Sequence, residues 1–465
     1  MSYKNLDDAI QAAGTPVKML RNSQLGPYVY PVVPSEFSNW RDEQRAWKET
    51  AVLFNQSYHM ADMWIKGPDA IKLLSATGIN SFENYSVNKA KQFVGCSYDG
   101  YVIGDAILFY LDKDELLLVG RPSIHNWVQY HAEKDGFKVS LSRDERSIAR
   151  DTPIVRRLYR YQVQGPNANL VLNKLNGGPI PDIKFFNMGE ITIAGRKVRA
   201  LRHGMSGAPG LELWGPHEER EEIRAAIAEA GKEFGLRQVG ARAYATNTLE
   251  SGWIPSPMPG VYSGEKMKAY RQWLSGNGYE ATASLAGSFY SDNIEDYYLT
   301  PWDVGYGFMV KFDHDFTGRE ALEKIAKNPK RKKVTLAWNA DDCTKIIGSM
   351  FQKGGDPYKC IDLPLTNYAS LPYDKVSRNG KMIGLSTFSG YSFNERAMLS
   401  LGIIDVEHAE VGTQVTFVWG EEGGGSSKPT VERHKQIEVR ATVGPVPYGQ
   451  QARETYAEGW RTGKK

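Results

Sequence analysis

The stretch His203-Gly-Met-Ser-Gly-Ala-Pro-Gly-Leu-Glu212-Leu213 decides how this chain is interpreted. Glycine, alanine and serine dominate it, and such small residues let the backbone approach a ligand closely. Glu212 alternates with Leu211 and Leu213, so we expect its side chain to point off the apolar face of a short strand. One carboxylate can accept two N–H bonds from a heterocycle with an amidine-like edge. The stretch therefore indicates a site for such a ring, with an ordinary surface turn as the alternative.

The composition is that of a globular protein large enough for two or three domains. The chain has 465 residues, of which 41% are hydrophobic and 24% charged, with a net charge of +3. So small a charge predicts no nucleic-acid partner, and we interpret the basic run at residues 327–333 as a solvated linker. Three cysteines without Cys-x-x-Cys spacing fit a reducing compartment. With no signal pattern and no bilayer-length apolar run, we expect a cytoplasmic protein that enters no membrane.

A repeated sequence segment indicates two related lobes. Residues 63–70 (Met-Trp-Ile-Lys-Gly-Pro-Asp-Ala) and 161–168 (Tyr-Gln-Val-Gln-Gly-Pro-Asn-Ala) each predict a strand, a Gly-Pro turn and the start of a helix. Asp69 and Asn167 occupy the positions from which a side chain can cap that helix. Two such units favour two related α+β lobes, although Gly-Pro also recurs by chance.

Other segments have clear local patterns. Residues 102–110 and 115–119 are rich in Ile, Leu, Phe and Val and predict two buried strands. Residues 216–233 predict a helix that begins at a proline, carries glutamates in its first turn and ends near Gly231. Beyond the basic run the pattern changes to short strands, with a hairpin turn at Asn379-Gly380 and a glycine-serine loop at 423–427. This predicts an all-β module, either a small barrel or a sandwich.

Several kinds of cofactor site have no counterpart in the sequence. There is no Gly-x-Gly-x-x-Gly after a strand, no P-loop, no His-Glu-x-x-His, and no paired Cys/His spacing for zinc or a Rieske cluster. We therefore expect no metal site. The pattern favours a metal-free group transfer to an organic acceptor, with the difficult chemistry supplied by a cosubstrate.

Two further segments follow the Glu212 stretch in order. They are residues 241–252 (Ala-Arg-Ala-Tyr-Ala-Thr-Asn-Thr-Leu-Glu-Ser-Gly) and 311–322 (Lys-Phe-Asp-His-Asp-Phe-Thr-Gly-Arg-Glu-Ala-Leu). Together the three resemble the aminomethyltransferase (glycine-cleavage T-protein) family of tetrahydrofolate enzymes. Within that family the chain looks most similar to the tetrahydrofolate-dependent aryl O-demethylases, which act on lignin-derived methoxybenzoates.

The resemblance implies an α+β fold, an aminomethyltransferase-like three-domain cloverleaf with two related α+β lobes and a C-terminal β-barrel or sandwich module. We expect residues 1–325 to form the tetrahydrofolate- and substrate-binding region from two interleaved lobes. Residues 326–465 would form the C-terminal β module.

The resemblance also implies which residues hold the folate. Glu212 matches the family's pterin-binding carboxylate, and Arg242 matches an arginine placed for the glutamyl tail. The other matching cofactor-binding positions are Gln164, Val119, Trp253 and Phe186, the last in a Phe185-Phe186 pair. Alternatives stay open: Val119 and the phenylalanines as plain core, Gln164 as a partner of a neighbouring strand, and Arg242 in a structural ion pair.

The chain departs from the aminomethyltransferases at a motif that matters for their chemistry. They carry Gly-Gly-x-x-Asp-Asp, with its first aspartate beside the reactive pterin nitrogen. Here residues 100–105 are Gly-Tyr-Val-Ile-Gly-Asp, so that position is Gly104, and Asp105 matches the second, structural aspartate. A substrate amine needs the missing carboxylate, so we expect no glycine cleavage.

Breaking an aryl ether requires a donor for the departing phenolate, and tyrosine and histidine suit this task. The resemblance implies Tyr244 and His59 as the catalytic candidates, with a scaffold role as the alternative for His59. Arg121, at a predicted strand end, could hold a benzoate carboxylate by two-point contact, unless it is a plain surface arginine. Tyr30 and Gln56 could add hydrogen bonds to the substrate.

We thus expect a cytoplasmic demethylase whose partners are a small aromatic substrate and tetrahydrofolate. Syringate is favoured, then vanillate or 3-O-methylgallate, with 5-methyltetrahydrofolate and a phenol as products. The alternatives are a tetrahydrofolate methyltransferase for a sulfonium or methylamine substrate, or a folate-binding regulatory protein without turnover. Oligomeric state stays open.

Overall fold

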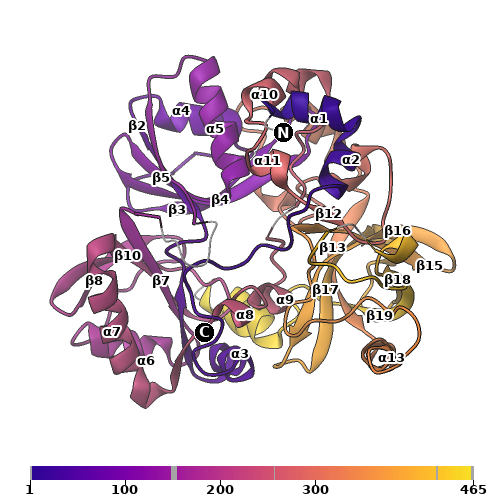
Figure 1. The fold of residues 1–465 in the computed structure, drawn as a ribbon. Coiled ribbons are helices and arrows are strands. Elements are labelled where there is room, and N and C mark those ends of the chain that lie inside the picture. The colour runs from indigo at the N-terminus through magenta and orange to yellow at the C-terminus, as the bar shows by residue number, and fades with distance from the viewer. Residues whose placement is uncertain (1–2, 148–153, 256, 426–427, 462–465) are drawn as a thin grey trace.

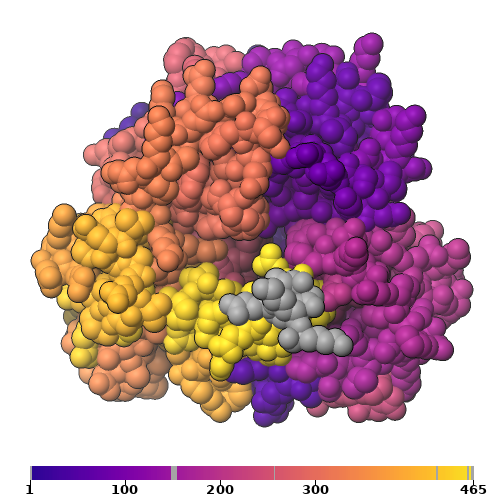
Figure 2. Space-filling model, turned by 180° about the vertical axis from the view of Figure 1, so that it is seen from behind, coloured from indigo at the N-terminus to yellow at the C-terminus, as the bar shows by residue number. Residues whose placement is uncertain are grey.

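The computed structural model describes residues 3–147, 154–255, 257–425 and 428–461, which form three bodies around a common centre (Figure 1). Two α+β lobes lie on one side and a barrel on the other. Seen from behind, the surface is hollowed where the lobes, the segment near residue 300 and the barrel meet (Figure 2). Among the described residues, no helix combines the length and apolar character needed to cross a membrane.

The first lobe is a five-stranded sheet in the order β3-β4-β5-β2-β6. Its strands are β2 (Ala61–Lys66), β3 (Ala90–Cys96), β4 (Val102–Asp112), β5 (Glu115–Gly120) and β6 (Ser140–Asp144). The helices α4 (Ala70–Thr77) and α5 (Pro122–Lys134) pack on it. The core holds Met63, Leu108, Leu118 and Trp127. The two strands predicted for residues 102–110 and 115–119 are therefore confirmed.

The second lobe is a six-stranded sheet in the order β11-β1-β7-β10-β9-β8. Its strands are β1 (Ala51–Asn55), β7 (Leu158–Gln164), β8 (Met188–Ile193), β9 (Arg196–Leu201), β10 (Gly210–Pro216) and β11 (Leu236–Gln238). The helices α6 (Ala168–Leu175) and α7 (Arg220–Gly231) pack against each other beside it. Because β1 precedes the first lobe in the chain but pairs with β7 and β11, the two lobes are interleaved.

The repeated sequence segment forms the same local structure in both lobes. β2 leads through Gly67 to α4, and β7 leads through Gly165 to α6. Both glycines have positive φ (140° and 124°), and a Cβ would lie 2.3 Å from the Lys138 carbonyl oxygen and 2.5 Å from that of Thr50. Neither position could hold a larger residue without strain. This explains why each unit has a glycine before its proline.

One local expectation is wrong, and the start of one predicted helix is corrected. Asp69 and Asn167 precede their helices, but neither side chain caps them. Asp69 instead accepts from the Lys138 backbone and Asn167 donates to Phe234, because packing neighbours compete for these groups. The helix expected from residue 216 begins at Arg220, since Pro216 still pairs in β10 and residues 217–219 form a 3₁₀ turn (η1). Its α-helical part does end at Gly231.

The C-terminal part contains a closed six-stranded barrel in the order β13-β17-β16-β15-β18-β19. Its strands are β13 (Arg331–Trp338), β15 (Asp374–Arg378), β16 (Lys381–Ser392), β17 (Ala397–Asp405), β18 (Gln414–Trp419) and β19 (Ile437–Gly444). Asn379 and Gly380 form the β15–β16 turn with positive φ, as predicted. Of the expected loop 423–427, Ser426 and Ser427 lie outside the described residues.

The expectation of an all-β module is wrong. Helix α13 (Ala340–Ser349) follows β13, and a π-helical segment, η8 (Ala452–Trp460), follows the barrel. Asn339 caps α13 by accepting from the backbone of Asp341 and Asp342, which place negative charge at the helix N-terminus. This Asn-x-Asp-Asp sequence was a readable helix signal.

The remaining elements connect the three bodies. The N-terminal helices α1 (Leu6–Ala13) and α2 (Pro16–Arg21) lie beside α10 (Lys268–Trp273) and α11 (Tyr279–Thr282) (Figure 1). Helix α3 (Trp40–Glu49) packs on β1. The short elements are α8 (Ala241–Tyr244), α9 (Asn247–Ser251), α12 (Arg319–Ile325), β12 (Leu285–Ala286) and β14 (Leu371–Pro372).

Candidate active site

The two catalytic candidates lie together in a buried aromatic cluster. Tyr244, at the end of α8, has its hydroxyl 3.5 Å from Nε2 of His59, which lies on the loop between β1 and β2. The ring of Tyr30 lies 3.9 Å from the Tyr244 ring and 4.5 Å from the His59 ring, measured between centroids. Chain segments separated by more than 180 residues thus bring three proton-bearing side chains to one place.

Burial controls the protonation of this cluster. It raises the pKa of Tyr244 and of Tyr30 above the ordinary value, because a phenolate would lose its hydration. It lowers the pKa of His59 well below its usual range, and the positive charges of Arg121 and Arg156 add to the effect. At neutral pH the cluster therefore consists of two neutral phenols and a neutral imidazole, with protons available only from the phenols and one ring nitrogen.

Some polar atoms of this region lack a well-formed hydrogen bond among the described residues. The Tyr30 hydroxyl, Nδ1 of His59 and Oε1 of Gln56 are buried without a hydrogen bond of normal geometry there, although Tyr30 and Gln56 interact with Tyr244. Gln56 donates instead to Gln162, at 3.2 Å, and lies 3.5 Å from the sulfur of Met205. A buried polar atom without a partner costs free energy. Three of them in one region are expected where a polar ligand completes the bonding.

Glu212 lies on β10 beside this cluster. Its neighbours Leu211 and Leu213 face the core of the second lobe, so its side chain points to the other face, as predicted. It accepts a 2.6 Å bond from Nη1 of Arg160 and lies 3.6 Å from Nδ1 of His203. Burial alone would raise the pKa of Glu212, but His203 and Arg160 outweigh it and hold the pKa below its ordinary value. Glu212 is thus a buried carboxylate that stays ionised.

Gln164 organises the glycine-rich loop in front of Glu212. Its Oε1 accepts from the backbone and the hydroxyl of Ser206, at 2.9 and 2.6 Å. The same loop is held from the other side by Tyr456 of η8, whose hydroxyl accepts from the Gly204 backbone at 2.9 Å. The open alternative for Gln164, a partner of a neighbouring strand, is replaced by a loop-positioning role. The C-terminal part thus covers this side of the site through the π-helical segment η8, an element that the sequence did not predict.

Arg121 is half-buried where β5 ends and α5 begins. Its Nε donates to the Pro255 carbonyl at 2.9 Å, so it is not a free surface arginine. It lines a small recess together with Asp105. Oδ2 of Asp105 accepts from Trp253, at 3.3 Å, and from Tyr306, at 3.1 Å. Trp253 is therefore held at the recess by the aspartate that the sequence comparison treated as structural.

Val119 and Phe186 lie in an apolar cluster between the two lobes, with Phe109 and Trp214. The backbone of Phe186 accepts from Ala90 at 2.8 Å, which ties the second lobe to the first. The plain-core interpretation fits the buried Val119, whereas Phe186 is half-buried and its ring centre lies 5.2 Å from that of His203. Arg242 is exposed and donates to Glu36, at 3.2 Å, and to the Leu363 carbonyl, at 2.7 Å. It forms the structural ion pair that the sequence left as an alternative, away from the aromatic cluster.

Several residues of the site carried little sequence signal. Arg160 and Gln162 face Glu212 and Gln56 from β7, and only their polarity within an apolar strand could have revealed them. His203 and Met205 belong to the opening stretch itself but have no distinctive pattern. These four residues belong to the site only because the fold brings their segments into contact.

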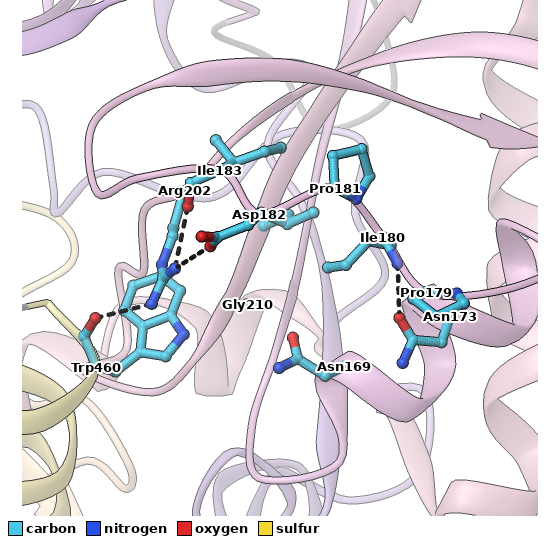
Figure 3. Close-up of a pocket in the computed structure, with 11 residues that line it drawn as sticks. Asn169, Asn173, Pro179, Ile180, Pro181, Asp182, Ile183, Arg202, Gly210 and Trp460 are labelled. Carbon is cyan, nitrogen blue, oxygen red and sulfur yellow. Dashed lines mark hydrogen bonds and ion pairs between the residues drawn. The ribbon is translucent and has the colours of Figure 1, made fainter. Parts of the chain in front are cut away.

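A hollow of about 330 Å³ lies elsewhere, on the outer face of the second lobe (Figure 3). Arg202 and Trp460 close one side of it, and Asn169 lies opposite on α6. Gly210 and Leu211 of the Glu212 stretch line it, but none of the predicted catalytic, substrate-binding or cofactor-binding residues does. We place the candidate site at the aromatic cluster, because the proton-bearing and unpaired buried groups gather there.

Comparison with known proteins identifies relatives over the whole length. The GCVT N-terminal domain family matches residues 17–256. The syringate O-demethylase of Sphingobium sp. (strain NBRC 103272 / SYK-6) is 52% identical over 461 residues, 99% of each chain. The sesamin methylene transferase of Sinomonas sp. (strain No.22) is 32% identical over 432 residues, 90% of each chain.

A solved structure supports the architecture. The aminomethyltransferase T of the glycine cleavage system from Bartonella henselae superimposes with a TM-score of 0.58, covering 92% of each chain at 18% identity. The expected α+β cloverleaf with a C-terminal barrel is thereby confirmed. The division at residue 325 stays a prediction. With a family match over half the chain and a relative 52% identical over 99% of it, this protein belongs to the aminomethyltransferase family of one-carbon-transferring enzymes.

Proposed function

We propose that this protein is a cytoplasmic, tetrahydrofolate-dependent aryl O-demethylase that moves the ether methyl of a methoxybenzoate to tetrahydrofolate. Syringate is the favoured substrate, then vanillate or 3-O-methylgallate. The observation that carries the proposal is the buried Tyr244–His59–Tyr30 cluster beside Glu212, with a proton kept on each tyrosine. The 52% identity to a syringate O-demethylase supports the choice of substrate.

The residues around Glu212 fit a pterin. Glu212 stays ionised and can accept N–H bonds from an amidine-like ring edge, and the neighbouring Nη2 of Arg160 is buried without a hydrogen bond in the described chain. Gln164 would keep the Ser206 loop in position, and Trp253, Val119 and Phe186 would supply walls. Bound tetrahydrofolate supplies the nucleophilic nitrogen that accepts the methyl group.

Tyr244 would act as the hydrogen-bond or proton donor to the leaving group. When the methyl–oxygen bond breaks, its electron pair stays on the aryl oxygen, and a phenolate is a poor leaving group at neutral pH. The Tyr244 hydroxyl holds its proton and would donate it, or a hydrogen bond, to that oxygen. Such a donor commonly contributes roughly 100- to 10,000-fold in rate. His59 would orient the hydroxyl as a neutral acceptor.

The remaining predicted residues would orient the substrate. Arg121 would hold the carboxylate, and Tyr30 and Gln56, whose buried oxygens lack a hydrogen bond of normal geometry in the described chain, would bond ring oxygens. A sulfonium or ammonium substrate leaves as a neutral group and needs no proton. A hydroxyl donor placed beside the leaving oxygen therefore favours an ether over those alternatives, and turnover distinguishes the demethylase from a regulatory protein.

The test is an anaerobic incubation of the purified protein with tetrahydrofolate and syringate, then vanillate, followed by an assay for 5-methyltetrahydrofolate. We expect product from both without added metal or nicotinamide, with more from syringate. Tetrahydrofolate binding without product from either ether would refute the demethylase.

A further inference from the structure

A second arginine lies beside the substrate region, and the sequence did not single it out. Arg146 follows β6, and its guanidinium carbon lies 4.6 Å from the ring centre of Tyr28 and 5.1 Å from that of Tyr279. Arg121 approaches the same Tyr28 ring at 5.7 Å. The Tyr28 hydroxyl lies 3.4 Å from the backbone oxygen of His59. Two arginines therefore flank one aromatic ring at the edge of the catalytic cluster.

These two arginines differ from the other arginines nearby in having no ion-pair partner among the described residues. Arg156 pairs with Asp62 at 2.9 Å, and Arg160 pairs with Glu212 at 2.6 Å. Nη1 of Arg146 is buried and makes no hydrogen bond with the described chain. Two cations in a half-buried place repel each other and lose hydration, and Asp105 and Glu280 attract them only from beyond ion-pair distance. An anionic ligand would remove both costs.

The nearby acids Asp105 and Glu280 attract Arg121 and Arg146 electrostatically, but their hydrogen bonds are made to other residues. Glu280 accepts two bonds from Nδ2 of Asn126, at 3.0 and 3.1 Å, and Glu145 pairs with Arg143 at 3.0 Å. Asp105 lines the recess of Arg121, but its Oδ2 is held by neutral donors, among them Gln92 at 2.7 Å. Arg121 and Tyr279 both line the recess, and the guanidinium of Arg146 lies 5.1 Å from the centre of the Tyr279 ring.

We propose that Arg146 and Arg121 together form a carboxylate-binding site that selects anionic aryl ethers, with Arg146 as a specificity-determining residue. The inference rests on the proposed function and adds a second arginine to its carboxylate-binding site. The same chemistry could serve a glutamyl carboxylate of the folate. We assign the aryl acid, because Tyr28 and its two arginines adjoin His59 of the cluster that would receive the aryl ring.

The experiment measures equilibrium binding by calorimetry, which needs no turnover. Syringate, 2,6-dimethoxyphenol (the same ring without the carboxylate) and tetrahydrofolate are titrated into the wild type, Arg146→Gln and Arg146→Lys. Charge-assisted bonds to carboxylates predict that Arg146→Gln weakens syringate binding roughly 10- to 100-fold. Binding of 2,6-dimethoxyphenol and tetrahydrofolate should change less than about 3-fold. Arg146→Lys should be intermediate, since it keeps the charge but loses the two-point geometry.

Arg157→Gln is the matched control, because Arg157 lies immediately before β7 and pairs with Asp144 of β6 at 2.9 Å, outside the cluster. It should leave all three affinities unchanged. If Arg146→Gln fails to fold, Arg146→Lys carries the comparison. Equal losses for syringate and 2,6-dimethoxyphenol, or a loss confined to tetrahydrofolate, would overturn the inference. Selective loss of syringate affinity in a protein that makes no 5-methyltetrahydrofolate would uphold it while refuting the demethylase.

Discussion

Burial and nearby charges set the protonation states of the side chains in the candidate site. Tyr244 and Tyr30 keep theirs, His59 cannot gain a second, and Glu212 stays ionised only because Arg160 and His203 outweigh burial. Each effect has the sign that its local environment dictates. Residue by residue, the site is a set of neutral donors beside one buried anion.

Replacing Tyr244 with Phe removes one oxygen and keeps the ring contacts with Tyr30 and Phe54. We expect kcat for syringate to fall roughly 100- to 10,000-fold, because the departing phenolate loses its donor. Tetrahydrofolate affinity should change little, since Glu212 is untouched. Steady-state kinetics and folate titration measure the two effects. Turnover close to the wild-type rate would exclude Tyr244 as the donor.

The pH dependence follows from the same groups. The pKa of Tyr244 is raised and that of His59 lowered, so both shifts move these titrations away from neutrality. We expect kcat at saturating substrate to be nearly constant from about pH 7 to 9, where neither group changes charge. A decline in that window that disappears in Tyr244→Phe would show that Tyr244 ionises there, contrary to this expectation. For stability, the depressed His59 pKa means that the unfolded chain binds more protons, so acidification below about pH 6.5 destabilises the fold.

At the scale of elements, the strand–glycine–helix unit is used twice, and each copy brings a helix close to the backbone of another segment. In the second lobe the close contact is between Gly165 and Thr50, at the junction of α3 and β1. β1 leads directly into the loop with Gln56 and His59. The glycine therefore contributes to the position of the catalytic loop as well as to the packing of α6.

Gly165→Ala tests this contact. An added Cβ would lie 2.5 Å from the Thr50 oxygen at a φ of 124°, so strain and displacement together should cost about 2–4 kcal/mol of unfolding free energy. Gly195→Ala is the control, since its φ is 76° but no atom lies within 4 Å of the new Cβ. It should cost only about 1–2 kcal/mol. Urea unfolding midpoints compare the two, and equal losses would mean that the contact with Thr50 is unimportant.

At the scale of the whole molecule, buried Glu250 of α9 links the second lobe to the barrel. It accepts from Trp47 of α3 at 2.9 Å and from Ser392 of β16 at 2.6 Å. Asn394 donates to it as well, at 3.2 Å. Burial raises the pKa of Glu250, and these donors oppose that shift. One side chain thus joins three segments that lie far apart in sequence.

Glu250→Ala would leave two buried donors, Trp47 and Ser392, without that acceptor, whereas Asn394 keeps its bond to the Gln44 carbonyl at 2.9 Å. At about 1–3 kcal/mol for each unsatisfied group, we expect a loss of several kcal/mol. The barrel should then unfold separately from the lobes, giving two transitions in calorimetry. Glu395→Ala, which removes a nearby ion pair with Lys48 at 3.1 Å, should cost less than about 1 kcal/mol. A single unshifted transition in Glu250→Ala would show that the link does not couple the bodies.

The sequence by itself determined the features that depend on local pattern. The two strands of the first lobe, the repeated unit and the barrel strands could be predicted, because hydrophobic periodicity and glycine punctuation act over a few residues. The stretch around Glu212 indicated a site because backbone exposure and an isolated carboxylate are local properties. The predicted capping by Asp69 and Asn167 was wrong, because these side chains bond to neighbouring segments instead. The prediction of an all-β C-terminal part was wrong, because Asn339 caps a helix that was not predicted.

Only the tertiary structure decided which polar groups meet. Arg160 joins Glu212 across two strands, Tyr456 reaches Gly204 from the end of the chain, and Arg146 shares Tyr28 with Arg121. None of these contacts has a characteristic spacing, because each depends on how separate elements pack. The physical reason is that burial and charge compensation are properties of a completed fold, and a group has no altered pKa and no missing partner until distant segments enclose it.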